Sequence, residues 1–219
     1  MALILIEQKK YDGAIVKLKN ILSLAPDAEK VRFYLAAVYE EVKDYSDAIE
    51  QFGYITPKST LYPEAIVHSA YLQKLKGNVS GASDLMAKAL AARPDVAQFY
   101  SFYSSMLDEQ KQTLKAVEVL TEGVKRFPAD DQLYFYLGSM QDKAGQKNVA
   151  IDSLKKAIEI NPKHVQALNY LGYTLIEMND DLDEAEKLIR QAYKLKPTDP
   201  YITDSLGWVL FKKGEFKES

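Results

Sequence analysis

The 219-residue sequence predicts an all-α fold of stacked antiparallel helix pairs, and the period shared by two residue types carries this prediction. Prolines recur 34 residues apart at Pro94, Pro128 and Pro162, while Pro26 lies two periods earlier and Pro197 follows after 35 residues. Alanines keep the same step at Ala14, Ala48, Ala82, Ala116 and Ala150, and Ala185 follows after 35 residues. Two residue types with one period indicate tandem copies of a single structural unit.

Numbering each unit from 1 to 34 makes residues 1–219 a single solenoid of repeats, with one extra residue in "MNDDLDEA". The complete repeats are 29–62, 63–96, 97–130, 131–164 and 165–199, and partial repeats occupy 1–28 and 200–219. Each complete repeat is expected to contain two amphipathic helices of about 12 to 14 residues, which are too short to be stable alone. Their apolar faces must therefore pack against each other and against the next repeat.

The turns and helix ends follow from glycine and proline. Gly77, Gly145 and Gly214 fall where a helix end favours a left-handed residue. Pro57 comes earlier than the proline of the other repeats, so the second helix of repeat 29–62 should be short and "TPKSTLYP" should form a longer connection. Near the end of the chain, "SLGWVLF" predicts a helix, "KKGE" predicts a turn, and Phe216 to Ser219 should begin a return helix.

The repeat columns resemble those of the tetratricopeptide repeat, a helix-turn-helix unit of 34 residues, over the whole chain. Column 8, which holds a small residue in that family, reads Ala36, Ala70, Ser104, Gly138, Gly172 and Gly207. The bulky aromatic of column 4 is kept only as Tyr100 and Tyr134. The resemblance implies a right-handed superhelix whose inner wall is formed by the first helix of each repeat. The stretch from Leu168 to Trp208 looks like paired repeats of bacterial proteins, without deciding between a cytoplasmic and a periplasmic or outer-membrane-associated location.

Composition and motifs argue against several function classes. A net charge of -3 gives no general attraction to nucleic acid, and "MALILIEQKK" is too short to span a membrane. No cysteine is present, and His68 and His164 belong to separate repeats, His164 being expected in a loop. "NDDLDE" lacks the glycine and the distal glutamate of a calcium loop, so helix-start and turn roles for Asp181 and Asp183 are favoured. We therefore expect no enzyme activity, no metal and no cofactor.

Columns 5, 9 and 12 of the first helices should face the inner wall and bind a partner. The wall combines acidic and hydroxyl residues in the middle with aromatic residues toward the end, a surface suited to a peptide with apolar anchors and some basic groups. The alternative for each aromatic residue is packing against a neighbouring helix. The carboxylate-binding clamp of relatives that bind chaperone tails is missing, because column 5 has no lysine and column 9 no asparagine. The candidate groove residues are Phe33, Tyr71, Asp108, Phe135, Asp142, Asn169, Tyr173, Ile176, Tyr201, Trp208 and Phe211.

The favoured function is a non-enzymatic scaffold that holds a peptide or protein segment in the concave groove. The alternative is a structural assembly element that associates with itself through the solenoid ends. Met1 falls in column 7 and Ser219 in column 20, so we expect a piece of a longer array. On this interpretation the last helix should expose Leu206, Val209 and Leu210 and promote end-to-end contacts.

Overall fold

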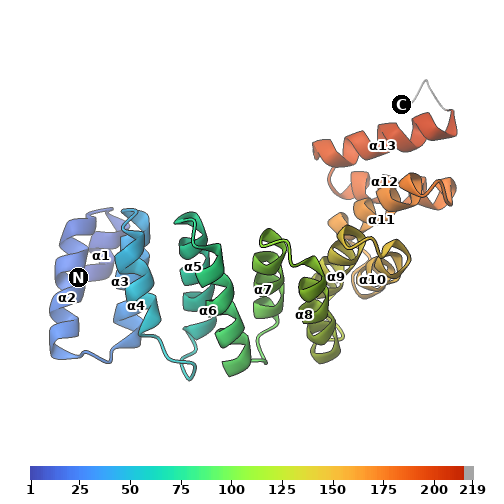
Figure 1. Ribbon diagram of the computed structural model, residues 1–219. Coiled ribbons are helices and arrows are strands. Elements are labelled where there is room, and N and C mark those ends of the chain that lie inside the picture. The colour runs from blue at the N-terminus through green and yellow to red at the C-terminus, as the bar shows by residue number, and fades with distance from the viewer. Residues whose placement is uncertain (215–219) are drawn as a thin grey trace. The chain divides into compact units, whose positions relative to one another are not determined.

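The computed structural model describes residues 1–214, and every regular element among them is an α-helix (Figure 1). The all-α class predicted from the sequence is therefore confirmed. The chain divides into two compact units, Met1–Lys111 and Gln112–Ser219. The return helix expected from Phe216 to Ser219 lies outside the described residues.

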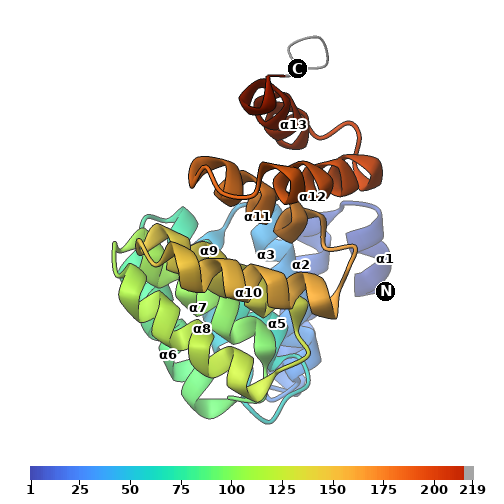
Figure 2. The same cartoon turned by 90° about the vertical axis from the view of Figure 1, so that its right-hand side faces the viewer.

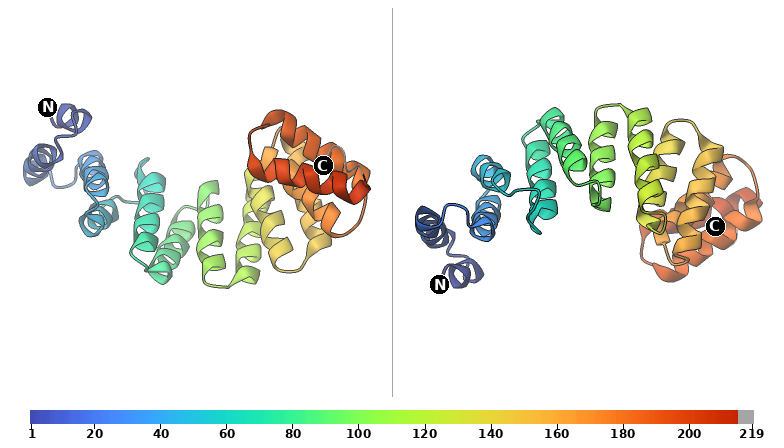
Figure 3. Two further views of the ribbon diagram at one scale, coloured as in Figure 1. Left: turned by 90° about the horizontal axis from the view of Figure 1, so that it is seen from above. Right: turned by 90° about the horizontal axis from the view of Figure 1, so that it is seen from below.

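The first unit contains seven helices in which neighbours along the chain pack together (Figures 1 and 3). Their bounds are α1 Ala2–Glu7, α2 Tyr11–Leu24, α3 Glu29–Glu41, α4 Tyr45–Gly53, α5 Tyr62–Leu75, α6 Val79–Ala92 and α7 Ala97–Glu109. Helix α4 has 9 residues, whereas α2 and α6 each have 14. The short second helix expected before Pro57 is thus confirmed.

The described part of the second unit, residues 112–214, contains six helices and repeats the same local arrangement. Their bounds are α8 Thr113–Arg126, α9 Asp131–Lys143, α10 Lys147–Ile160, α11 Val165–Glu177, α12 Leu182–Leu195 and α13 Pro200–Lys213. Helix α12 packs against both α11 and α13, and α13 also contacts α11 (Figure 2). Lys213 of α13 forms ion pairs with Asp183 and Glu186 of α12, which tie these two helices together at one end.

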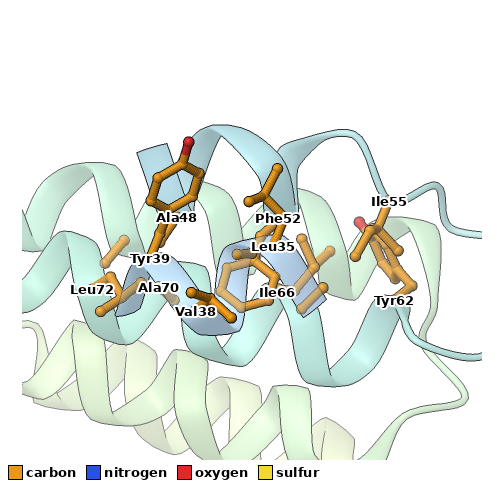
Figure 4. Packing of buried hydrophobic residues seen from close by; sticks show 14 of the residues in the cluster. Leu35, Val38, Tyr39, Ala48, Phe52, Ile55, Tyr62, Ile66, Ala70 and Leu72 are labelled. Atoms are coloured by element: carbon orange, nitrogen blue, oxygen red, sulfur yellow. The ribbon is translucent and has the colours of Figure 1, made fainter. Parts of the chain in front are cut away.

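Small residues let the paired helices approach closely. The alanines of the 34-residue period have no exposed surface, and a Cβ at Gly172 would lie 2.6 Å from Cγ1 of Ile189. In the first unit, Leu35 and Phe52 join Ile66 and Leu72 in one core formed by α3, α4 and α5 (Figure 4). Helices as short as these depend on such packing for their stability.

Left-handed residues end the first helices and turn the chain. Gly77, Gly145 and Gly214 have φ of 78°, 79° and 79°, which confirms the predicted caps. Lysine or asparagine takes this conformation in the other turns, at Lys9, Lys43, Lys111 and Asn179. Asp181 accepts a hydrogen bond from the backbone N–H of Glu184 and caps α12, so its predicted helix-start role is also confirmed.

The last described helix buries the residues that were expected to be exposed. Val209 and Leu210 are 0% and 2% exposed, and Leu206 is half-buried. All three belong to the core shared by α10, α11, α12 and α13. The prediction was wrong because α11 and α12 already cover this side of α13. Within residues 1–214, the longest apolar stretches of helix fall short of what crossing a membrane requires.

Candidate functional site

An open hollow of about 830 Å³ lies between α11 and α13 in the second unit. Its lining consists of Tyr173 from α11 and Pro200, Thr203, Asp204, Gly207, Trp208 and Phe211 from α13. Three of the eleven predicted groove residues, Tyr173, Trp208 and Phe211, therefore meet at one place.

The register of α13 decides which side chains reach this hollow. Pro200 occupies the first turn, and the Asp199 carboxylate accepts a hydrogen bond of 3.1 Å from the backbone N–H of Tyr201. Proline at this position and an aspartate cap fix the start of the helix. From that start, Tyr201, Asp204, Trp208 and Phe211 follow at spacings of three and four residues and share one face. We call these four residues the outer face of α13.

The aromatic side chains of the outer face are exposed, and two of them stack on each other. The Trp208 and Phe211 rings stack with centroids 5.7 Å apart and planes 9° apart. The Lys212 ammonium lies 4.9 Å from the Trp208 ring centroid, a cation–π distance. Trp208 is 40% exposed, Phe211 51% and Tyr201 79%, so each presents apolar surface to solvent.

The charge in the hollow comes from one carboxylate. Asp204 is the only charged residue among the described residues that line it, and no described residue pairs with its carboxylate. At the rim, Glu177 forms an ion pair of 2.9 Å with Lys147. Burial, together with the negative charges of Glu177 and Asp204, raises the pKa of Tyr173, which therefore stays a neutral phenol.

Three further predicted groove residues are half-buried, and two of them, Phe135 and Asp142, are held by contacts inside the unit. The Phe135 ring lies 5.1 Å from the His164 ring and 6.2 Å from the Tyr170 ring, measured between centroids. Asp142 accepts a hydrogen bond of 2.9 Å from the Tyr170 hydroxyl, and burial together with this bond raises the pKa of Tyr170 to about 12. Oδ1 of Asp142 and Oδ1 of Asn169 are buried without a partner among the described residues. Phe135, Asp142 and Asn169 are thus partly covered by their own unit and only partly exposed.

Ile176 has to be removed from the predicted groove. It is 1% exposed and belongs to the core of α10 to α13. The column assignment placed it on the inner wall, but the packing of α13 onto α11 and α12 covers this position.

The first unit holds three of the predicted groove residues. The Phe33 ring packs edge-on against Phe52, with centroids 5.5 Å apart. Tyr71 lies exposed on α5, and Asp108 lies half-buried near the end of α7.

His164 lies in the connection before α11, as the sequence suggested, and it is also a buried helix cap. Its Nδ1 accepts a hydrogen bond of 3.2 Å from the backbone N–H of Ala167, so the imidazole ring caps the N-terminus of α11. Burial lowers the pKa of His164, because a charged imidazole would lose its hydration. Within residues 1–214, no three histidine, aspartate or glutamate side chains are placed to hold a metal ion.

Comparison with known proteins identifies the repeat. Family models described as tetratricopeptide repeat match residues 5–58, 131–164 and 153–187. The chain belongs to the tetratricopeptide repeat family. A curated relative, TPR repeat-containing protein PA4667 of Pseudomonas aeruginosa, is 30% identical over 192 residues, which are 87% of this chain and 32% of that protein. The chain therefore spans about a third of the relative's length, and the relative agrees with the expected bacterial origin.

Solved tetratricopeptide repeat structures share the fold. One is YrrB, described as a TPR protein with an unusual peptide-binding site, with a TM-score of 0.62 and 16% identity over 86% of this chain and 96% of that chain. Another is TTC0263, a thermophilic TPR protein of Thermus thermophilus, with a TM-score of 0.61 and 21% identity over 84% of this chain and all of that chain. The helical-repeat class of the molecule is thus shown by its relatives as well as by its own helices.

The repeat register also explains a recurring wall contact that the sequence did not predict. Tyr170 and His68 both occupy column 6, and each contacts the column 12 carboxylate of the preceding repeat: Tyr170 bonds Asp142, and His68 Nδ1 lies 2.8 Å from Glu40 Oε2. The column spacing alone does not predict this contact between columns 6 and 12. Asp204 was visible in column 5, but its free carboxylate became apparent only beside the aromatic rings of the hollow.

Proposed function

We propose that this chain is a non-enzymatic scaffold that holds an extended or helical peptide segment of another protein against the hollow between α11 and α13. Tetratricopeptide repeat proteins are in general protein–protein interaction scaffolds. The observation that carries the finer proposal is that Tyr173, Trp208 and Phe211 line one open hollow with their apolar surfaces exposed.

The chemistry of these side chains suits a peptide partner. Tryptophan and tyrosine are enriched among the residues that dominate binding energy at protein interfaces. A hollow of about 830 Å³ has room for one or two side chains of a bound segment. YrrB is described as having a peptide-binding site, and we extend this class of partner to the present chain because of its own exposed aromatic residues.

Peptide selection with matched variants tests the proposal. Random twelve-residue peptides displayed on phage are selected on the chain, and the affinities of the selected peptides are measured by calorimetry. Tyr173→Ala combined with Trp208→Ala should weaken binding by at least about thirtyfold, since the loss of a single aromatic anchor worth about 2 kcal/mol already gives that factor. Helical content should stay unchanged, because both side chains are exposed.

The control variant is Tyr193→Ala, which removes an exposed tyrosine from α12, outside the lining of the hollow. Its affinities should equal those of the unmodified chain. Equal binding by the double variant and the unmodified chain would refute the proposed site, and so would a selection that yields no binding peptide.

Self-association remains a second proposal, and exposed apolar residues at the first helices favour it. Leu24 is 88% exposed at the end of α2, and Leu3 and Ile4 of α1 are exposed as well. Exposed apolar surface of this kind is typical of interaction sites. Light scattering decides the matter: a mass that rises with concentration above 24.7 kDa and persists in the Tyr173→Ala, Trp208→Ala variant supports self-association through the ends. A constant mass of one chain excludes it.

A further inference from the structure

We infer that the segment bound in the hollow between α11 and α13 places a cationic side chain, arginine or lysine, beside Asp204 and the aromatic rings. This inference rests on the proposed function and names the chemistry of its partner. It follows from three features of the hollow: its free carboxylate, its aromatic surfaces and the absence of a lysine or arginine among its described lining residues.

The carboxylate of Asp204 is exposed and has no ion-pair partner among residues 1–214, so a cation from another molecule can reach it. Asp204 is exposed, lines the hollow and is left without a hydrogen bond or ion pair by the residues that the structure describes. Other acids of α11 and α12 are already paired, as Glu177 is with Lys147 and Glu186 is with Lys213 and Arg190. An arginine or lysine entering the hollow would give Asp204 a charged hydrogen-bond donor.

The aromatic rings favour the same charge. The face of an indole ring carries partial negative charge and attracts cations. The chain itself shows this preference, because the Lys212 ammonium lies over the Trp208 ring at 4.9 Å from its centroid. Lys212 is exposed to solvent, so a cation from a partner can replace it there.

An anionic segment would fit poorly. A carboxylate entering the hollow would meet Asp204 and the negative ring faces, and the neighbouring Tyr173 carries no positive charge. The nearby cations Lys147 and Lys212 lie outside the lining and are engaged with Glu177 and Trp208. Charge complementarity therefore selects a cationic side chain flanked by apolar residues.

The experiment uses random twelve-residue peptides displayed on phage, and then synthetic copies of the selected peptides. Arginine or lysine should be enriched among peptides that bind the chain and fail to bind the Tyr173→Ala, Trp208→Ala variant. Replacing the enriched arginine by citrulline, its uncharged isostere, or the enriched lysine by norleucine, should weaken binding about fivefold to thirtyfold. Asp204→Asn should weaken binding of the charged peptide about twofold to fivefold and leave binding of its uncharged copy unchanged.

Asp152→Asn provides the matched control, since Asp152 is an exposed aspartate on α10 outside the hollow. It should leave both affinities unchanged. Selected peptides that lack basic residues but still require Tyr173 and Trp208 would overturn the cationic partner and leave the proposed site intact. A citrulline or norleucine peptide that binds as tightly as the charged one would overturn it as well, whereas peptides that ignore the aromatic residues would overturn the site itself.

Discussion

Gly172 gives the sharpest stability test of the repeat packing, because adding one methyl group there should have the opposite effect to adding it at Gly53. A Cβ at Gly172 would lie 2.6 Å from Cγ1 of Ile189 and 3.0 Å from the backbone oxygen of Ala185. Ile189 is fully buried, and a backbone oxygen inside α12 cannot move freely. The methyl group therefore overlaps atoms that have no space to yield.

The magnitude follows from two opposing terms. Replacing glycine by alanine inside a helix stabilises it by about 1 kcal/mol. Overpacking a core costs about 1–3 kcal/mol, and the contacts at Gly172 place it in the upper part of this range. Gly172→Ala should therefore lower the free energy of unfolding by about 1–2 kcal/mol. At Gly53 of α4 nothing lies within 4 Å of the added Cβ, so Gly53→Ala should raise that free energy by up to about 1 kcal/mol.

Urea denaturation measures both effects. Trp208 is the only tryptophan and shares the second unit with Gly172, so its fluorescence reports the unfolding of that unit. Circular dichroism at 222 nm serves Gly53→Ala in the first unit. Combining Gly172→Ala with Ile189→Ala should cost less than the sum of the two single changes, because the truncated side chain makes room for the methyl group. A Gly172→Ala variant as stable as the unmodified chain would refute the argument.

Two further predictions concern the buried polar residues of the second unit. His164→Asn replaces the capping Nδ1 by a side-chain oxygen that can also cap α11, and it removes a buried group whose pKa is lowered in the folded state. The unmodified chain should lose stability as the pH falls from about 7 through that lowered pKa, and the variant should lose less when urea denaturation is repeated at each pH. An unchanged pH slope would contradict this. Tyr170→Phe removes the hydrogen-bond donor to Asp142, whose other oxygen is already unpartnered, and should cost about 1–3 kcal/mol. The exposed Tyr193→Phe should stay within about 0.5 kcal/mol, and equal effects of the two changes would refute the role of the Asp142 bond.

The helical repeat could be predicted from the sequence because its cause is local and periodic. Alanine is required wherever two helices cross, and proline recurs where the second helix ends, so both leave a visible period of 34 residues. Helices α3, α7, α9, α11 and α13 begin at the first column of their repeats. Pro57 likewise predicted the early end of α4.

The sequence could predict only which face of the first helices carries the site, because a repeat column does not specify which residues pack against it. Asp142 and Ile176 share column 12, yet Asp142 bonds Tyr170 while Ile176 lies in a core. Val209 and Leu210 were expected to be exposed because the last repeat lacks its second helix. In the structure, α11 and α12 cover them instead. His164 follows a proline turn and is not among the common capping residues, so its role became clear only from its bond to Ala167.

The fluorescence of Trp208 tests the central claim most directly, because this single tryptophan lies in the proposed binding hollow. A selected peptide with a basic residue is titrated into the chain while the emission of Trp208 and its quenching by acrylamide are followed. We expect a saturable change in emission and protection from acrylamide, with the same midpoint as the calorimetric titration. Calorimetric binding without any change in Trp208 emission or quenching would place the peptide elsewhere and contradict the account.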